Sequence, residues 1–276
     1  MSAKTKKNYI QKLIETFVTY TMEPIPFPFT LKLSYVALSY IVSTVGAFVA
    51  LTAADNIATK GRALNRVNLF AASMALGGIG IWSMHFIGML AMRIDMGIGY
   101  SLIETLISLV AAVGGCMLAL YWVARHPGSK WHLLQAGLFL GLAVCVMHYL
   151  GMYGMRFGGF FEWSGLLVTL SIVIAIVAAT AALFLAFAVK GLTARALAAV
   201  VMGLAVCAMH YTGMQAATIM CTTETPQFIP SGFGVVGTYD LPALVSAFAL
   251  GMAGIIALDQ LIQKLGIQSP PSQPRS

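Results

Sequence analysis

A six-residue motif occurs three times in the chain, each time inside a long run of apolar residues. It reads Met-His-Phe-Ile-Gly-Met at 84–89, Met-His-Tyr-Leu-Gly-Met at 147–152 and Met-His-Tyr-Thr-Gly-Met at 209–214. The histidines are 63 and then 62 residues apart, which indicates that one structural unit is repeated. A histidine is costly to hold in a membrane-spanning segment, so each copy is a candidate functional position.

Seven apolar segments, each near or above the roughly 20 residues that span a bilayer, follow one another along the chain. They are approximately Ser34–Ala54, Leu69–Met92, Gly99–Val123, Leu133–Met152, Gly165–Val189, Leu197–Ile219 and Leu241–Ile262. Only 9% of the residues are charged, which is outside the range of soluble domains. The sequence predicts an all-α membrane protein with seven transmembrane helices. We expect helix one to be followed by three helix pairs (two with three, four with five, six with seven), each opened by a motif helix, in a pseudo-threefold arrangement.

Helical periodicity places several side chains near each histidine. The residue four positions after a histidine lies on its face of the helix, and these residues are Met89, Met152 and Met214. The same face is predicted to hold Met92 and Met155 at His+7, Gly78, Gly141 and Gly203 at His−7, and Trp82, Cys145 and Cys207 at His−3. The methionines directly before the histidines point about 100° away and either contact a neighbouring helix or pack. The glycine at His+3 suits close approach of a neighbouring backbone.

These residue types predict a metal site. Imidazole binds copper, zinc and iron, and thioether sulfur selects soft ions, above all cuprous copper. The candidate ligands are His85, His148, His210, Met89, Met152, Met214, Met84, Met147 and Met209. Two alternatives stay open, because histidines also form hydrogen bonds between helices and methionine is an adaptable core residue. Copper is favoured over zinc and over haem, for which the chain has no Cys-x-x-Cys-His attachment segment.

The repeated motif, with the flanking segments Gly80-Ile81-Trp82-Ser83 and Tyr239-Asp240-Leu241, resembles the MHYT family of bacterial integral-membrane sensor domains. The resemblance runs from about Ser34 to Ile262, and the first copy has Phe86 in place of the tyrosine. It implies a sensor of oxygen, carbon monoxide or nitric oxide, or of redox state, that acts through a bound metal, copper being favoured. In many relatives the domain precedes a diguanylate cyclase, a cyclic di-GMP phosphodiesterase or a histidine kinase.

Three classes of function follow from this resemblance and from the residues. As a sensor, the protein would signal to a separate cytoplasmic partner, because residues 263–276 form only a short cytoplasmic Ser/Pro/Gln-rich tail. As a copper-handling protein, it would bind or pass on the ion without a signalling role. As an enzyme it would need a cofactor site that the sequence does not contain, so we expect no enzymatic activity.

The distribution of charge predicts the orientation. One side of the predicted membrane carries the cations Lys60, Arg62, Arg66, Arg125, Lys130, Lys190, Arg195, Lys264 and Arg275, and the other has Arg93 and Arg156 in its loops. By the positive-inside rule the N-terminus is periplasmic and the C-terminus cytoplasmic, in a bacterial inner membrane. The histidines then lie in the outer half, below a rim that holds Asp95, Glu104, Glu162, Glu224 and Asp240 and attracts cations. Orientation explains the net charge of +7 better than nucleic-acid binding does.

The N-terminal segment 1–33 has two interpretations. Four of its five lysines, Lys4, Lys6, Lys7 and Lys12, accompany apolar residues that recur at helical spacing, which predicts an amphipathic helix on the membrane surface. It could instead be a disordered tail, or the chain could start at Met22 and not at Met1. The late start would remove four of the five N-terminal cations that run against the predicted orientation.

Overall fold

The computed structural model describes residues 24–58 and 64–266, so the predicted N-terminal helix, Met22 and most of the C-terminal tail lie outside the described residues. Seven spans in this part are long and apolar enough to cross a membrane, which confirms the predicted fold class. Six are the helices α2 (Leu33–Ala54), α5 (Leu102–Arg125), α6 (Lys130–Tyr153), α7 (Gly165–Ala188), α8 (Leu192–Gln215) and α9 (Asp240–Lys264). The remaining one, the second in the chain, consists of α3 (Arg66–Ser73), the π-helix η1 (Met74–Ser83) and α4 (Met84–Met89).

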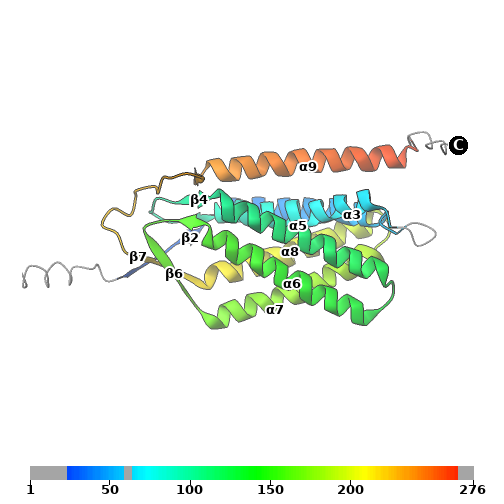
Figure 1. Cartoon of the computed structure of the whole chain (residues 1–276), viewed down its shortest axis with the longest axis horizontal. Coiled ribbons are helices and arrows are strands. Elements are labelled where there is room, and N and C mark those ends of the chain that lie inside the picture. The colour runs from blue at the N-terminus through cyan, green and yellow to red at the C-terminus, as the bar shows by residue number, and fades with distance from the viewer. Residues whose placement is uncertain (1–23, 59–63, 267–276) are drawn as a thin grey trace, which may run out of the picture.

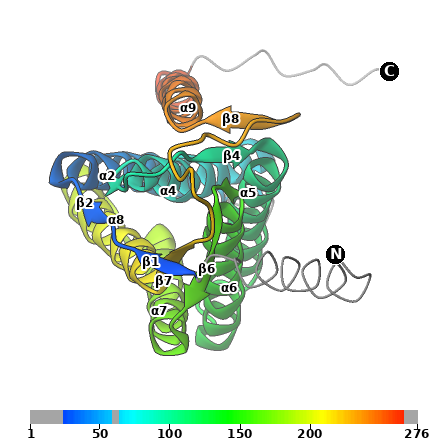
Figure 2. The same ribbon diagram turned by 90° about the vertical axis from the view of Figure 1, so that its left-hand side faces the viewer.

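Six spans form a closed ring in the order α2, η1 with α4, α5, α6, α7 and α8, in which each motif helix stands between two helices without a motif (Figure 2). The seventh span, α9, lies outside the ring and packs against η1, α2 and α4 (Figure 1). The ring has the expected pseudo-threefold order, but the expected pairing of helices six and seven is wrong. Helix six, α8, packs instead against α7 and against helix one, α2.

Each motif helix touches the next ring helix at a glycine where the two backbones come close. A Cβ added to Gly141 would lie 2.6 Å from Ile176 of α7, and one added to Gly203 would lie 2.5 Å from Thr44 of α2. In the first copy the corresponding residue is Gly77, whose Cβ would lie 2.7 Å from Ala112 of α5. The glycine at this contact is therefore at His−8 in the first copy and at His−7 in the other two.

The π-helix accounts for this difference of one residue. A π-helical turn contains more residues than an α-helical turn, so η1 takes up the additional residue before His85. Gly78, expected on the histidine face, faces α9 instead, since a Cβ added to it would lie 3.5 Å from the ring of Phe248. Trp82, also expected there, donates its indole N–H to the carbonyl of Thr105 on α5. The expected periodicity of 100° per residue is wrong across this segment.

Short antiparallel strands cover one end of the ring, which we call the strand end. The strands are β1 (Ile25–Phe27), β2 (Thr30–Leu31), β3 (Met92–Arg93), β4 (Gly99–Ser101), β5 (Met155–Arg156), β6 (Gly159–Trp163), β7 (Ala217–Cys221) and β8 (Val235–Gly237). They form sheets in the orders β1-β7-β6, β2-β3 and β5-β4-β8. The helices therefore end before Met92 and Met155, and the prediction that these two methionines lie on the histidine face of a helix is wrong.

At the opposite end of the ring, an ion-pair cluster joins two ring helices. Asp55, which follows α2, accepts hydrogen bonds from Lys190 and Arg195, which lie at the junction of α7 and α8. Burial raises the pKa of Asp55, but the hydrogen bonds and charges of the two cations outweigh burial and hold the pKa below its ordinary value. The carboxylate is therefore charged at neutral pH and fastens α2 to α8, where the ring closes.

Candidate metal centre

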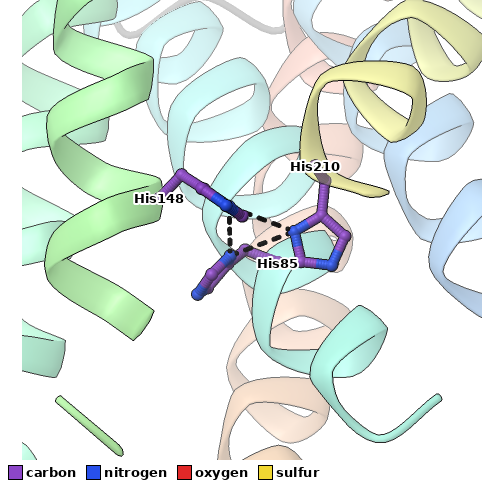
Figure 3. A group of neighbouring side chains, drawn as sticks. All are labelled: His85, His148 and His210. Atoms are coloured by element: carbon purple, nitrogen blue, oxygen red, sulfur yellow. Dashed lines mark hydrogen bonds between the residues drawn. The ribbon is translucent and has the colours of Figure 1, made fainter. Parts of the chain in front are cut away.

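The three motif histidines converge at one point inside the ring, near its strand end (Figure 3). The Nδ1 atoms of His85 and His148 are 3.1 Å apart, those of His85 and His210 are 3.2 Å apart, and those of His148 and His210 are 3.3 Å apart. All three side chains are buried, with at most 1% of their surface exposed. Within the described residues, this is the one group of three or more His, Cys, Asp or Glu side chains arranged to hold a metal ion.

Each imidazole rests on the glycine of another motif, and the three contacts form a cycle. The Nε2 atom of His85 would lie 2.4 Å from a Cβ at Gly151, that of His148 would lie 2.3 Å from one at Gly213, and that of His210 would lie 2.5 Å from one at Gly88. The glycine at His+3 therefore makes room for the imidazole of a neighbouring helix, where we had expected a neighbouring backbone. The position of the glycine in each motif therefore determines where the histidine of another motif can lie.

Hydrogen bonds among the imidazoles cannot satisfy this cluster. A nitrogen of neutral imidazole carries either a hydrogen or a lone pair. Among three neighbouring Nδ1 atoms, at least two are therefore both donors or both acceptors, and those two cannot form a hydrogen bond with each other. The three Nε2 atoms are also buried, and each lacks a hydrogen-bond partner in the structure. A buried polar group without a partner costs about 1–3 kcal/mol. A cation bound by three lone pairs would satisfy all three Nδ1 atoms together.

The spacing of the nitrogens fits a tetrahedral metal ion. Nitrogen ligands at the usual zinc distance of about 2.0–2.1 Å lie about 3.3–3.4 Å from one another at the corners of a tetrahedron. The observed Nδ1 separations of 3.1–3.3 Å are close to this value. Three imidazoles would occupy three corners and leave the fourth for another ligand, as metal centres that bind a small molecule require.

The aromatic residue after the histidine positions the imidazole. In the second motif the ring of Tyr149 meets the ring of His148 edge to face at a centroid distance of 4.9 Å, and its hydroxyl is 2.6 Å from Ser171 Oγ on α7. In the third motif Tyr211 makes the same contacts, with Ser39 Oγ of α2 at 2.9 Å from its hydroxyl. The tyrosine thus anchors its helix to a neighbour and holds the adjacent histidine in place.

The first motif achieves the same anchoring with different residues. Phe86 has no hydroxyl, and the indole N–H of Trp82, 3.0 Å from Ser108 Oγ, takes over the bond to the serine of the neighbouring helix. Phe86 still meets the ring of His85 edge to face, at a centroid distance of 4.7 Å. The sequence carried a signal for this exchange, because Ser108 and Ser171 stand at the same distance, 23 residues, after their histidines. We did not recognise it from the sequence.

The six motif methionines are all buried, with 1–2% of their surface exposed. Met89 lines a cavity of about 830 Å³ at the strand end, together with Met92, Met96 and the charged Arg93 and Asp95. Met209 lines a second, much smaller cavity on the other side of the histidines. Two of the predicted ligands therefore face cavities on opposite sides of the cluster, and metal ligation by any methionine stays a prediction.

Comparison with known proteins supports the family resemblance. The family model MHYT, described as a bacterial signalling protein N-terminal repeat, matches residues 78–137 and 141–199. These matches begin at Gly78 and Gly141, seven residues before the first two motif histidines. No solved structure matches the chain.

Several curated proteins are similar over about two thirds of the chain. The bifunctional diguanylate cyclase/cyclic di-GMP phosphodiesterase MucR of Pseudomonas aeruginosa is 41% identical over 190 residues, which is 66% of this chain and 27% of MucR. The signaling protein YkoW of Bacillus subtilis is 31% identical over 196 residues, 68% of this chain and 24% of YkoW. The cyclic di-GMP phosphodiesterase NbdA of P. aeruginosa is 32% identical over 201 residues, 70% of this chain and 25% of NbdA. The chain thus spans about a quarter of the length of these relatives.

Proposed function

Because the chain belongs to the MHYT family of bacterial membrane signalling proteins, we propose that His85, His148 and His210 bind one metal ion, and that the ion senses a diatomic gas or the redox state. The observation that carries the proposal is the convergence of three Nδ1 atoms at 3.1–3.3 Å in a buried site. The ion would supply an open coordination position for oxygen, carbon monoxide or nitric oxide. The protein would hold three imidazoles in fixed orientations around that position and exclude water from it.

Copper is the metal that the surrounding residues favour. Three histidines alone would suit zinc or copper equally, but thioether sulfur prefers cuprous copper. Six buried methionines belong to the three motifs, and Met89 also faces the cavity at the strand end. A metal that changes its oxidation state would also make the site responsive to redox conditions, which zinc would not.

The signal would leave the membrane at the end opposite the strands. The cations at that end favour a cytoplasmic location for it by the positive-inside rule, with the strand end on the periplasmic side of a bacterial inner membrane. Two relatives are named for the turnover of cyclic di-GMP, which supports a cytoplasmic signalling module of that kind as the receiver. We place the sensing role, and no enzymatic role, in the seven membrane spans.

Handling of copper without signalling is the second candidate, and the cavity at the strand end favours it. Met89, Met92 and Met96 line this cavity, so a soft ion could enter from the strand end. Beyond the histidines, however, Ile81, Val144 and other apolar side chains line the interior. Met202 and Met209 are the only side chains of this lining with a ligand atom, and it includes no imidazole or carboxylate, so the arrangement fits storage or sensing better than transport.

Elemental analysis of the full chain, purified in detergent after growth with copper, tests the proposed site. We expect close to one copper per chain, and near-complete loss of copper after each of the changes His85→Ala, His148→Ala and His210→Ala. A shared site predicts this complete loss because two imidazoles bind far more weakly than three. The matched control is His132→Ala, which changes an imidazole that stacks on His126 outside the cluster and should leave the copper content unchanged. Loss of only a third of the metal in each variant, or protein without metal under all conditions, would refute the proposal.

A further inference from the structure

A small apolar cavity lies on the side of the three histidines away from the strands. Its volume is about 40 Å³, and it is lined by residues of η1, α6, α7 and α8. One layer of its wall consists of Ile81, Val144 and Val206, which each precede a motif histidine by four residues, about one helical turn. Met209, directly before His210, lines it as well. The cavity therefore lies about one helical turn from the histidine cluster.

The lining makes the cavity unsuitable for water. All twelve lining residues are apolar: Leu76, Ile81, Leu140, Val144, Ala175, Ala178, Ala179, Ala182, Met202, Ala205, Val206 and Met209. A buried water needs two to four polar partners and about 10–15 Å³, so space is ample here and polar partners are missing. Apolar cavities of this kind stay dry and bind small apolar molecules such as xenon.

The side chains that line the cavity are smallest on α7. Four alanines of α7 line it, and two of them, Ala178 and Ala182, are partly exposed. Small side chains leave room for a small apolar solute to pass from the hydrocarbon core of the bilayer. Met209, which lines the cavity and directly precedes His210, has an unbranched side chain that adopts several conformations at little cost.

We propose that this cavity binds a small apolar molecule of the size of a diatomic gas. The molecule enters past α7 from the bilayer and is held close to the three histidines. The inference rests on the proposed function for the identity of the gas, but binding in the cavity requires no metal. It also gives Met209 a role as the movable wall of the cavity, where the sequence suggested a metal ligand.

Crystals of the full chain pressurised with xenon test the cavity directly. We expect a xenon peak bounded by Val144, Ala179 and Met209 in the wild type, and loss of that peak in Ala179→Leu, whose larger side chain fills the space. The matched control is Ala181→Leu on the exposed face of the same helix, which should keep the peak. Ala205→Val fills the cavity from α8 with a smaller change, and should also remove xenon if Ala179→Leu does not fold.

A second measurement separates the cavity from the metal site. In copper-loaded protein, filling the cavity should leave the copper content at the wild-type level and slow the rebinding of carbon monoxide after flash photolysis several-fold. No xenon in the wild type, xenon that persists in a folded Ala179→Leu variant, or a lipid or detergent chain in the cavity would overturn the proposal. Xenon bound in the cavity of a protein that takes up no copper would support the cavity and refute only the proposed metal site.

Discussion

At the scale of single residues, the glycine at His+3 determines whether the three imidazoles can meet. Each of these glycines receives the imidazole of another helix, so the motif works only when all three copies are present. From the sequence, the spacing of histidine, glycine and methionine indicates a shared site, because repeats of nearly constant length place three histidines at the same depth. The cyclic contacts could not be predicted, since they depend on which helices become neighbours in the ring.

Replacement of Gly151 by alanine tests this role. The added Cβ would lie 2.4 Å from Nε2 of His85, so the imidazole has to move away from the cluster. We expect copper affinity to fall about 10- to 100-fold, as for other residues that orient metal ligands. The measurement is competition of the purified protein with a cuprous chelator.

The matched control is Gly251→Ala in α9, where nothing lies within 4 Å of the added Cβ. Alanine is favoured over glycine within a helix by about 1 kcal/mol, so loss of helix stability would not explain a lower affinity in the first variant. Equal copper affinity in both variants would contradict the proposed contact.

At the scale of elements, the second span differs from the other motif helices because it packs against three helices, α2 and α5 in the ring and α9 outside it. Its π-helix presents Gly77 to α5, and its Gly78 and Trp82 face Phe248 of α9. Hydropathy predicts where this span begins and ends. The assignment of side chains to its faces assumes a constant helical period, and the additional residue breaks that period without changing the apolar run. The short strands were missed for a related reason. Pairing across the strand end joins segments far apart in the sequence, such as Ile25 with Cys221.

The same span is joined to α9 a second time, near its start. Asn68 of α3, which has no exposed surface, accepts a hydrogen bond from Gln260 at 2.7 Å and donates one to Gln263 at 3.0 Å. A buried amide bonded in this way fixes the relative position of two helices. Movement of the helix that carries His85 should therefore be passed to the end of α9, from which the chain continues to its C-terminus.

We expect Asn68→Ala to release the end of α9 while leaving the histidine cluster intact. Each lost bond between helices is worth about 0.6 kcal/mol in a membrane protein, so hydrogen exchange in the last two turns of α9 should become a few-fold faster. Copper content should stay at the wild-type level. Ser73→Ala is the control, because this buried hydroxyl bonds only within its own helix, to the carbonyl of Leu69. Unchanged exchange in Asn68→Ala would show that α9 is held by its apolar contacts alone.

At the scale of the whole molecule, the ring has two chemically different ends. The strand end carries the large cavity with Met89 at its inner side, and the opposite end carries the ion pairs of Asp55. The histidines lie within two turns of the ends of α4, α6 and α8 at the strand end. The location of the site relative to the membrane therefore follows directly from the orientation of the chain.

Reporter fusions test this orientation. Fusions after Lys130, Lys190 and Lys264 should be active in the cytoplasm, because the cations beside these junctions hold their loops on that side. Fusions after Met96, Gly159 and Ser231 should be active in the periplasm, because these positions belong to the strand end. Alkaline phosphatase and green fluorescent protein give opposite signals on the two sides, so each junction is measured twice. A reversed pattern would place the histidines in the cytoplasmic half of the membrane, and the signal would then have to leave from the strand end.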